Sequence, residues 1–407
     1  MRLLDTKYLR LKEFVGNRIP QYAILSHTWG DEEVLFQDIK GHLSLTWIWK
    51  HGSKKVRASC RRAALDGYKY IWIDTCCIDK SSSAEISESI NSMFAWYQSA
   101  SVCYAFLEDV QSLERLTDSR WFTRGWTLQE LIAPCDVRFY NKNWELLGDR
   151  YRLLKSQVRV TGIDMSILTY GHLVNTLPWE AHTRPDQRHV KGFCTACEYE
   201  VRSVRGLLGE VSVSQKMIWA SPRSTTRAED LSYCLLGIFG VSMTLIYGEG
   251  QEKAFRRLQE TILREWDDQT ILAWCASGTG GPVNQVFATS PPQFLLGKYN
   301  VRPMELQATR VRIEMALGGV YLTTILYPAP FYEFKGKNLW IAILDCVMGS
   351  DLRSRPALLL QELPGSERTF RRCGICIVEP PNCIRAIHYF RRGRNYSYGF
   401  KGTEYYI

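Results

Sequence analysis

The chain has 407 residues, which suffices for two or three domains. Hydrophobic residues make up 45% of it and aromatic residues 12%, so it can bury a sizeable core, and wholesale disorder is excluded. Lys and Arg number 51 against 42 Asp and Glu. The resulting net charge of +9 is small for this length, so nucleic acid is not the expected partner.

The cysteine pattern and the apolar segments indicate a cytoplasmic protein. The 13 cysteines are scattered, and several, such as Cys76 and Cys346, lie in apolar runs, which is typical of reduced, buried thiols. Residues 1–10 show no apolar stretch of a secretory signal. The most membrane-like segment, residues 234–247, is shorter than the roughly 20 apolar residues of a spanning helix, so no membrane partner is expected.

Four short apolar runs in the first third of the chain have strand character. They are residues 22–26 (YAILS), 70–74 (YIWID), 102–107 (VCYAFL) and 137–140 (VRFY). Helical patterns lie between them, at residues 56–65 and 84–100, where apolar side chains recur every three or four positions. Strands that alternate with helices predict a parallel sheet with helices on both faces.

The remainder of the chain shows two sequence patterns, one helical and one β-rich. Residues 149–276 are mostly helical in pattern, with the clearest helix at 248–266. Glycine- and proline-rich breakers then precede β-rich runs at residues 311–315, 320–327, 339–347 and 375–378. We therefore predict an α/β domain over residues 1–148, a helical region over 149–276 and a β-rich domain over 277–407.

Polar residues follow the first two predicted strands, where an open parallel sheet binds its ligands. They are His27, Trp29, Asp31, Asp74 and Asp79. The alternative for Asp31 and Asp74 is that they cap helices or turn loops. Ser26 and His27 are not expected to form a nucleophile–base pair, because neighbours on a strand point to opposite faces.

Three blocks of the sequence carry a resemblance to a known family. They are YAILSHTWGDEEVLFQDI (22–39), YIWIDTCCIDKSSSAEISESINSMFAWYQSA (70–100) and SRWFTRGWTLQELIAP (119–134). The blocks resemble those of fungal HET (heterokaryon incompatibility) domains in their order, their spacing and their Trp-containing motifs. Residues 227–262 are similar to the segment that commonly follows these domains, so the resemblance covers about two thirds of the chain. The second block departs from the commoner pattern at Lys80, where Gln is usual, and this changes the charge of any site that includes the side chain.

The HET resemblance implies a role in heterokaryon incompatibility or a related innate-immune cell-death response. It also implies self-association through the HET domain, and other incompatibility or NLR-type proteins as partners.

A more distant resemblance points to TIR domains. LSHTWGDE (25–32) resembles their first strand and loop, and WTLQEL (126–131) resembles the Trp-Cys-Leu-x-Glu-Leu word of plant TIR domains. The resemblance implies a TIR-like, flavodoxin-like parallel sheet of about five strands. It places on Glu130 the catalytic carboxylate that cleaves NAD+ in enzymatic TIR domains, with NAD+ as substrate, no cofactor and no metal. The substrate-binding set that this implies is Ser26, His27, Trp29, Gly30, Asp31, Asp74, Cys77, Asp79 and Trp126.

The chemistry suits a carboxylate, because cleavage of the nicotinamide–ribose bond builds positive charge on the ribose. An aromatic ring such as Trp29 could stack on a planar base. The alternative is a signalling or scaffold module without catalysis, in which Glu130 pairs with Arg120 or Arg124 and orients its helix.

Two weaker patterns remain open. Cys194-x-x-Cys197 follows His182 and His189, but the spacings match no common zinc site, and an incidental pattern is favoured. The basic and aromatic tail, residues 389–407, suits single-stranded nucleic acid or an Arg-protected edge strand, of which the edge strand is favoured.

Overall fold

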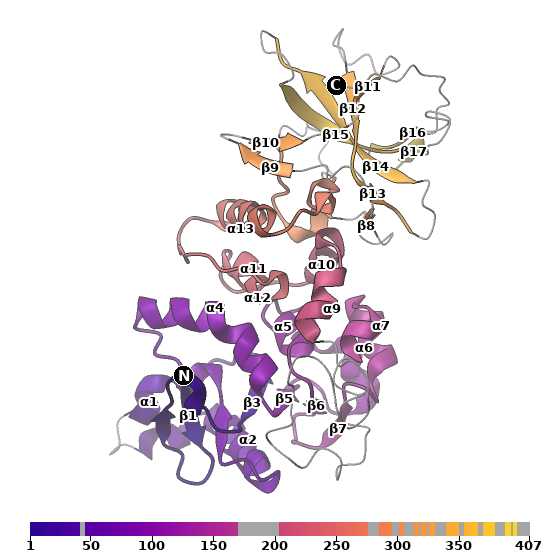
Figure 1. Ribbon diagram of the computed structural model, residues 1–407. Coiled ribbons are helices and arrows are strands. Elements are labelled where there is room, and N and C mark those ends of the chain that lie inside the picture. The colour runs from indigo at the N-terminus through magenta and orange to yellow at the C-terminus, as the bar shows by residue number, and fades with distance from the viewer. Residues whose placement is uncertain are drawn as a thin grey trace. The chain divides into compact units, whose positions relative to one another are not determined.

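The computed structural model describes residues 1–40, 45–169, 203–275, 285–294, 301–304, 313–316, 319–322, 324, 326–329, 339–349, 354–364, 369–378, 387–391 and 394–396. They form two compact units (Figure 1). The N-terminal unit comprises residues 1–208 and 223–245, and the C-terminal unit comprises residues 209–222 and 246–407.

The N-terminal unit is built on a seven-stranded sheet of order β2-β1-β4-β3-β5-β6-β7. Its strands are β1 (Arg2–Asp5), β2 (Leu11–Glu13), β3 (Ala23–His27), β4 (Tyr70–Trp72), β5 (Val102–Phe106), β6 (Val137–Tyr140) and β7 (Leu146–Asp149). The four predicted strands, β3 to β6, are the parallel centre of the sheet. The sheet is wider than the expected five strands because β1, β2 and β7 pair antiparallel at its edges.

The order of the central strands fixes the helical layers. Counted along the chain, the parallel strands lie in the order second, first, third, fourth, which is the order of a flavodoxin-like sheet. The direction of winding reverses between β3 and β5, so right-handed crossovers place α2 (Ser53–Leu65) on one face and α4 (Ser83–Ser99) on the other. The short helix α5 (Thr127–Ile132), between β5 and β6, packs against α4 and β3.

Helix α4 forms where its periodicity predicts it. Ser82 caps the helix by accepting a hydrogen bond from the Glu85 amide at 3.3 Å. Ile90, Met93 and Tyr97 are buried against the sheet, as their spacing predicts. The Tyr97 hydroxyl donates to the Leu25 carbonyl at 3.1 Å, which ties α4 to β3.

Smaller helices complete this unit. They are α1 (Phe36–Lys40), α3 (Asp74–Cys77), α6 (Leu154–Thr161), α7 (Met165–Leu168), α11 (Asp230–Tyr233), α12 (Leu236–Phe239) and the 3-10 turns η1 (Gly16–Arg18), η2 (Leu45–Trp49), η3 (Leu113–Asp118) and η4 (Arg120–Thr123). Helix α9 (Val204–Glu210) begins in this unit and ends in the other.

Segment 223–245 belongs to the N-terminal unit although it lies far along the chain. The Met243 amide donates to the Asn91 side chain at 3.2 Å, and α12 packs on α4. An ideal Cβ on Gly237 would lie 2.2 Å from the Cβ of Phe94. The contact of α12 with α4 therefore requires glycine at this position.

The C-terminal unit contains helices and the expected β-rich region. Its helices are α10 (Val213–Ala220), α13 (Gln251–Glu265), η7 (Gln269–Leu272) and η8 (Pro291–Gln293). Its strands are β8 (Arg302–Pro303), β9 (Ile313–Ala316), β10 (Gly319–Leu322), β11 (Leu326–Pro328), β12 (Leu339–Ile343), β13 (Cys346–Val347), β14 (Arg355–Glu362), β15 (Phe370–Val378), β16 (Ile387–Arg391) and β17 (Arg394–Tyr396). Six strands form the largest sheet, β11-β12-β14-β15-β16-β17, and β17 is its edge, as the edge-strand interpretation of the tail predicts.

The large C-terminal sheet has its own apolar core, which includes Tyr327, Leu339, Ile341 and Leu359. Across the described parts of both units, no helix is long and apolar enough to cross a bilayer.

Candidate functional site

Polar side chains gather at the carboxyl end of β3, on both faces of the sheet. Ser26 points to the face covered by α4 and α5, where it meets Glu130 of α5. His27 points to the face covered by α2, where it meets Asp74 at the start of α3. The prediction that Ser26 and His27 diverge is confirmed, so these adjacent residues do not act as a nucleophile and its base.

Glu130 is a buried carboxyl group with few polar neighbours. Its residue is 7% exposed, and it accepts a hydrogen bond from the Ser26 hydroxyl. The Ser26 oxygen in turn accepts from the Trp121 indole N–H at 2.8 Å. Burial raises the pKa of Glu130 to about 8 against the opposing effect of the Ser26 hydrogen bond. The carboxyl group is therefore largely protonated at neutral pH.

The raised pKa of Glu130 predicts a pH dependence of stability. An unfolded Glu ionises near pH 4.5, whereas the folded group keeps its proton until about pH 8, so folding takes up a proton between these values. The free energy of unfolding should fall across this window, by at most about 1.4 kcal/mol per pH unit. Denaturant titrations from pH 5 to pH 8 should show this slope reduced in Glu130→Gln.

If the free energy of unfolding of Glu130→Gln fell with pH as steeply as that of wild type, Glu130 would not be a buried acid with a raised pKa. Asp74 does not interfere with this test, because its pKa is shifted downwards. The stabilisation that Asp74 contributes is present above the unfolded pKa and is lost only in more acidic solution.

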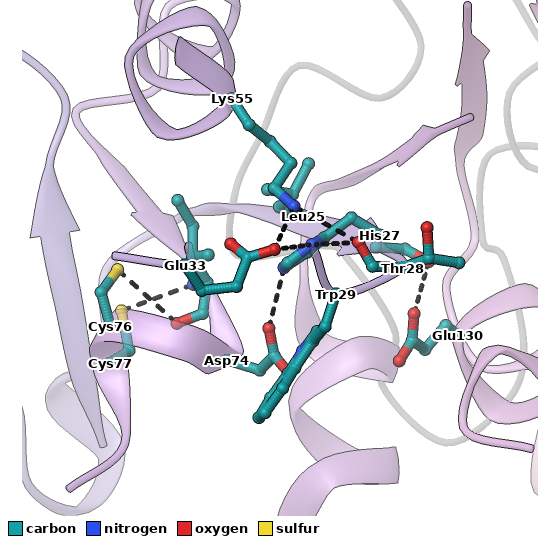
Figure 2. Close-up of polar contacts among 12 residues, drawn as sticks. Leu25, His27, Thr28, Trp29, Glu33, Lys55, Asp74, Cys76, Cys77 and Glu130 are labelled. Carbon is teal, nitrogen blue, oxygen red and sulfur yellow. Dashed lines mark hydrogen bonds and ion pairs between the residues drawn. The ribbon is translucent and has the colours of Figure 1, made fainter. Parts of the chain in front are cut away.

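The second group is centred on Asp74. Figure 2 shows His27 and Trp29 both directed at its carboxylate. His27 Nε2 lies 3.0 Å from one oxygen, and the Trp29 indole N–H donates to the other at 2.7 Å. Burial is the largest single influence on Asp74 and disfavours its charge, but the hydrogen bonds from His27 and Trp29 and the charges of His27 and Lys80 together outweigh it and hold the pKa of Asp74 below its usual range. Trp29 is 42% exposed as a residue, and its ring is fixed at one edge by an anion.

A buried ion pair supports the loop that carries Trp29. Glu33 accepts from the Lys55 ammonium at 2.5 Å (Figure 2). It also accepts from the Gly30 amide at 2.7 Å. Lys55, from α2, also donates to the Thr28 carbonyl at 3.3 Å. These contacts close the loop after β3 on itself and hold it against α2.

Lys80 covers one face of Trp29. Its ammonium nitrogen lies 3.3 Å from the centroid of the indole ring. The nitrogen is buried and has no hydrogen-bond partner within the described residues. Burial lowers the pKa of Lys80, and the carboxylates of Asp74 and Glu33 oppose this shift.

The other candidate residues lie around these groups rather than within them. Asp31 is exposed, and the Gly30 amide is bound to Glu33. The buried Cys77 sulfur accepts from the Ile73 amide at 3.4 Å. Asp79 accepts from the Ser81 amide at 3.0 Å, as a loop-turning carboxylate does.

Trp126 and the arginines near Glu130 have other partners. Trp126 precedes α5, and its indole N–H donates to Asp230 at 3.3 Å. The pairing of Glu130 with Arg120 that the alternative interpretation offered is not found, because Arg120 forms an ion pair with Glu108 at 3.1 Å. Arg124 donates instead to the Thr226 hydroxyl at 3.5 Å.

The sequence did not indicate Trp121, Glu33, Lys55 or Arg223 as part of the site. Arg223 is buried and donates to the Arg124 carbonyl at 2.8 Å and to the Thr127 hydroxyl at 3.0 Å, so segment 223–245 clamps the start of α5. Trp121 and Glu33 do lie inside the HET-like blocks, which is the only signal that could have found them.

The described residues contain no group of three or more His, Cys, Asp or Glu side chains arranged to hold a metal ion. The candidate set of His182, His189, Cys194 and Cys197 lies outside the described residues.

Comparison with known proteins relates the first part of the chain to a family. The sequence model described as "Heterokaryon incompatibility protein (HET)" matches residues 22–114, a range that includes β3, Asp74 and Lys80. The chain contains a HET domain. Over 280 residues, 64% of its length, it is 41% identical to the vegetative incompatibility protein HET-E-1 of Podospora anserina, of which it spans only 18%.

Two further comparisons bear on the regions beyond the HET domain and on the fold. Residues 253–313 match a domain of unknown function, DUF8212. No solved structure matches the chain.

Proposed function

We propose that this chain acts in heterokaryon, or vegetative, incompatibility as a cytoplasmic effector of cell death. The HET domain and the identity to a vegetative incompatibility protein support this proposal. We further propose that its partners are a second copy of the HET domain and other incompatibility or NLR-type proteins. The shared segment makes up only 18% of the relative, so the function assigned here concerns the HET domain and its neighbour.

We propose that the effector activity is cleavage of NAD+ at a TIR-like site, and one observation carries this proposal. A buried carboxyl group, Glu130, with a pKa raised to about 8, lies at the carboxyl end of the central strand of a flavodoxin-like sheet. Strongly shifted groups at such positions are candidates for chemistry. The order of the parallel strands also supports a TIR-like fold.

In this mechanism a ribose hydroxyl of the substrate takes the place of the Ser26 hydroxyl on Glu130. Glu130 first releases its proton to the solvent, and the positive charge that develops on the ribose as nicotinamide leaves with the bonding electrons is stabilised by the resulting carboxylate. Water then adds to the ribose, giving ADP-ribose and a proton. Trp29, held by Asp74, lines the same end of the sheet.

The test is NAD+ consumption and nicotinamide release by concentrated, purified protein. Glu130→Gln keeps the shape of the side chain but cannot carry the charge, so turnover should fall about 100-fold or more. Glu88→Gln, at an exposed position of α4, is the matched control and should retain wild-type turnover. Equal turnover in the two variants, or none in the folded wild type, would overturn the catalytic proposal.

A second candidate, a scaffold without catalysis, is favoured by a different observation. Glu130 is already satisfied by Ser26 within the fold, whereas large apolar side chains are exposed at Leu35 and Trp49, which are 41% and 86% accessible. Leu35 precedes α1, and α1 contacts η2, which carries Trp49. Exposed apolar side chains are where a partner would dock. Under this alternative, Glu130→Gln leaves cell death intact, and Trp49→Ser abolishes it.

A further inference from the structure

The face of Trp29 has the properties of a cation site. Its indole N–H is bound to the Asp74 carboxylate, which adds negative potential to that of the ring quadrupole. Trp29 is 42% exposed as a residue, so a ligand can reach it. Lys80 places its ammonium nitrogen 3.3 Å from the ring centroid, so the chain itself already puts a positive charge on this face.

The ammonium of Lys80 is weakly held in that position. Its nitrogen is buried without a hydrogen-bond partner within the described residues, and moving an ammonium out of water without new hydrogen bonds costs free energy. The contact with the ring returns only about 0.5–2 kcal/mol. If Lys80 turned outwards, its three donors would regain water.

We propose that the face of Trp29 is a subsite for a planar organic cation, and that Lys80 occupies this face in competition with the ligand. A flat pyridinium ring covers more of the indole than an ammonium group does, and its charge is not carried by N–H groups that need water. This inference rests on the proposed function, because the oxidised nicotinamide ring of NAD+ is a planar pyridinium cation. It makes Lys80 a determinant of how tightly the charged form of the ring is held.

The surroundings of Lys80 favour this role over capture of a phosphate. The carboxylates of Asp74 and Glu33 are close enough to stabilise the charge on Lys80. A phosphate that bound the ammonium would face the same two carboxylates, and like charges at short range repel. A cation on the ring of Trp29 is instead stabilised by the negative charges of Asp74 and Glu33.

The experiment measures calorimetric binding of 1-methylnicotinamide, a pyridinium without a glycosidic bond, and of neutral nicotinamide. Lys80→Met removes the competing charge, so it should bind the cation about tenfold more tightly than wild type does. Affinity for the neutral ring should change less than about twofold, because it gains little from the ring quadrupole. Lys69→Met, which removes an ammonium 5.5 Å from the ring of Tyr70, is the matched control and should change neither affinity.

Trp29→Leu in the Lys80→Met background should erase the gain for the cation. Unchanged or weaker binding of the cation by Lys80→Met, or equal tightening of both rings, would overturn the proposal. The probe cannot be hydrolysed, so a failure of NAD+ cleavage leaves this result intact. Conversely, a failure of cation binding leaves the comparison of Glu130→Gln with Glu88→Gln interpretable.

Discussion

Replacing Gly237 by alanine should destabilise the N-terminal unit by about 3 kcal/mol, because the added methyl group has no room. The ideal Cβ lies 2.2 Å from the Cβ and 2.7 Å from the Cγ of Phe94. Phe94 is 1% exposed in the middle of α4, so it cannot move aside without disturbing the sheet beneath it. Hydrogen exchange of the β3 and β5 amides measures the stability of the N-terminal unit alone. It should be faster in Gly237→Ala than in wild type.

The matched control is Gly206→Ala, the same chemical change in α9 of the same unit. Its Cβ would meet only the Ser203 hydroxyl, at 3.5 Å, which is ordinary contact. Alanine is favoured over glycine in helices by up to about 1 kcal/mol, so this variant should be as stable as wild type or more so. Equal exchange rates in the two variants would show that α12 does not pack on α4 as described.

The close approach at Gly237 illustrates what the sequence could not predict. Residues 149–276 were predicted to form one helical region, but residues 223–245 belong to the N-terminal unit and residues 246–276 to the C-terminal unit. The pairing of Met243 with Asn91 joins positions 152 residues apart. Periodicity reports only which residues share a face of their own element, so contacts of this range leave no local pattern.

Strands that are buried on both faces were predictable, and edge strands were not. The apolar runs of β3 to β6 mark the centre of the sheet because both of its faces are covered by helices. Strand β2 reads Leu-Lys-Glu and is partly exposed, which is typical of an edge. Such a segment cannot be told from a loop by composition, and for this reason the sheet exceeded the predicted width.

The place of the site was predictable, but its pairings were not. Polar residues after the first two predicted strands do gather at one end of the sheet, and the side chains of Ser26 and His27 point to opposite faces as predicted. The hydrogen bond of Ser26 to Glu130, however, depends on which face α5 covers, and that depends on where the winding reverses. The sequence marked Glu130 through its resemblance to TIR domains, while its surroundings became visible only in the fold.

The buried ion pair of Glu33 and Lys55 contributes both to the stability of the N-terminal unit and to the geometry of the loop that carries Trp29. The side chains of Glu33 and Lys55 are only 5% and 7% exposed, so neither charge is compensated by water. Each is stabilised by the other and by backbone groups of the loop: the Gly30 amide on Glu33 and the Thr28 carbonyl on Lys55. The geometry of Trp29 therefore depends on an ion pair between the loop (Glu33) and α2 (Lys55).

Lys55→Met should lower the free energy of unfolding by about 3–5 kcal/mol, because it leaves the carboxylate of Glu33 buried without its partner. Denaturant unfolding measures the loss, and Lys54→Met, the exposed neighbour on α2, is the control that should change stability by less than about 0.5 kcal/mol. Adding Glu33→Leu removes the stranded charge and should restore much of the stability, since apolar side chains of similar volume replace buried ion pairs well. It would not restore cation binding, because the Gly30 amide would lose its acceptor and the loop that carries Trp29 would loosen. If the double variant were no more stable than Lys55→Met, the cost would lie in lost packing of the lysine stem rather than in an unpaired charge.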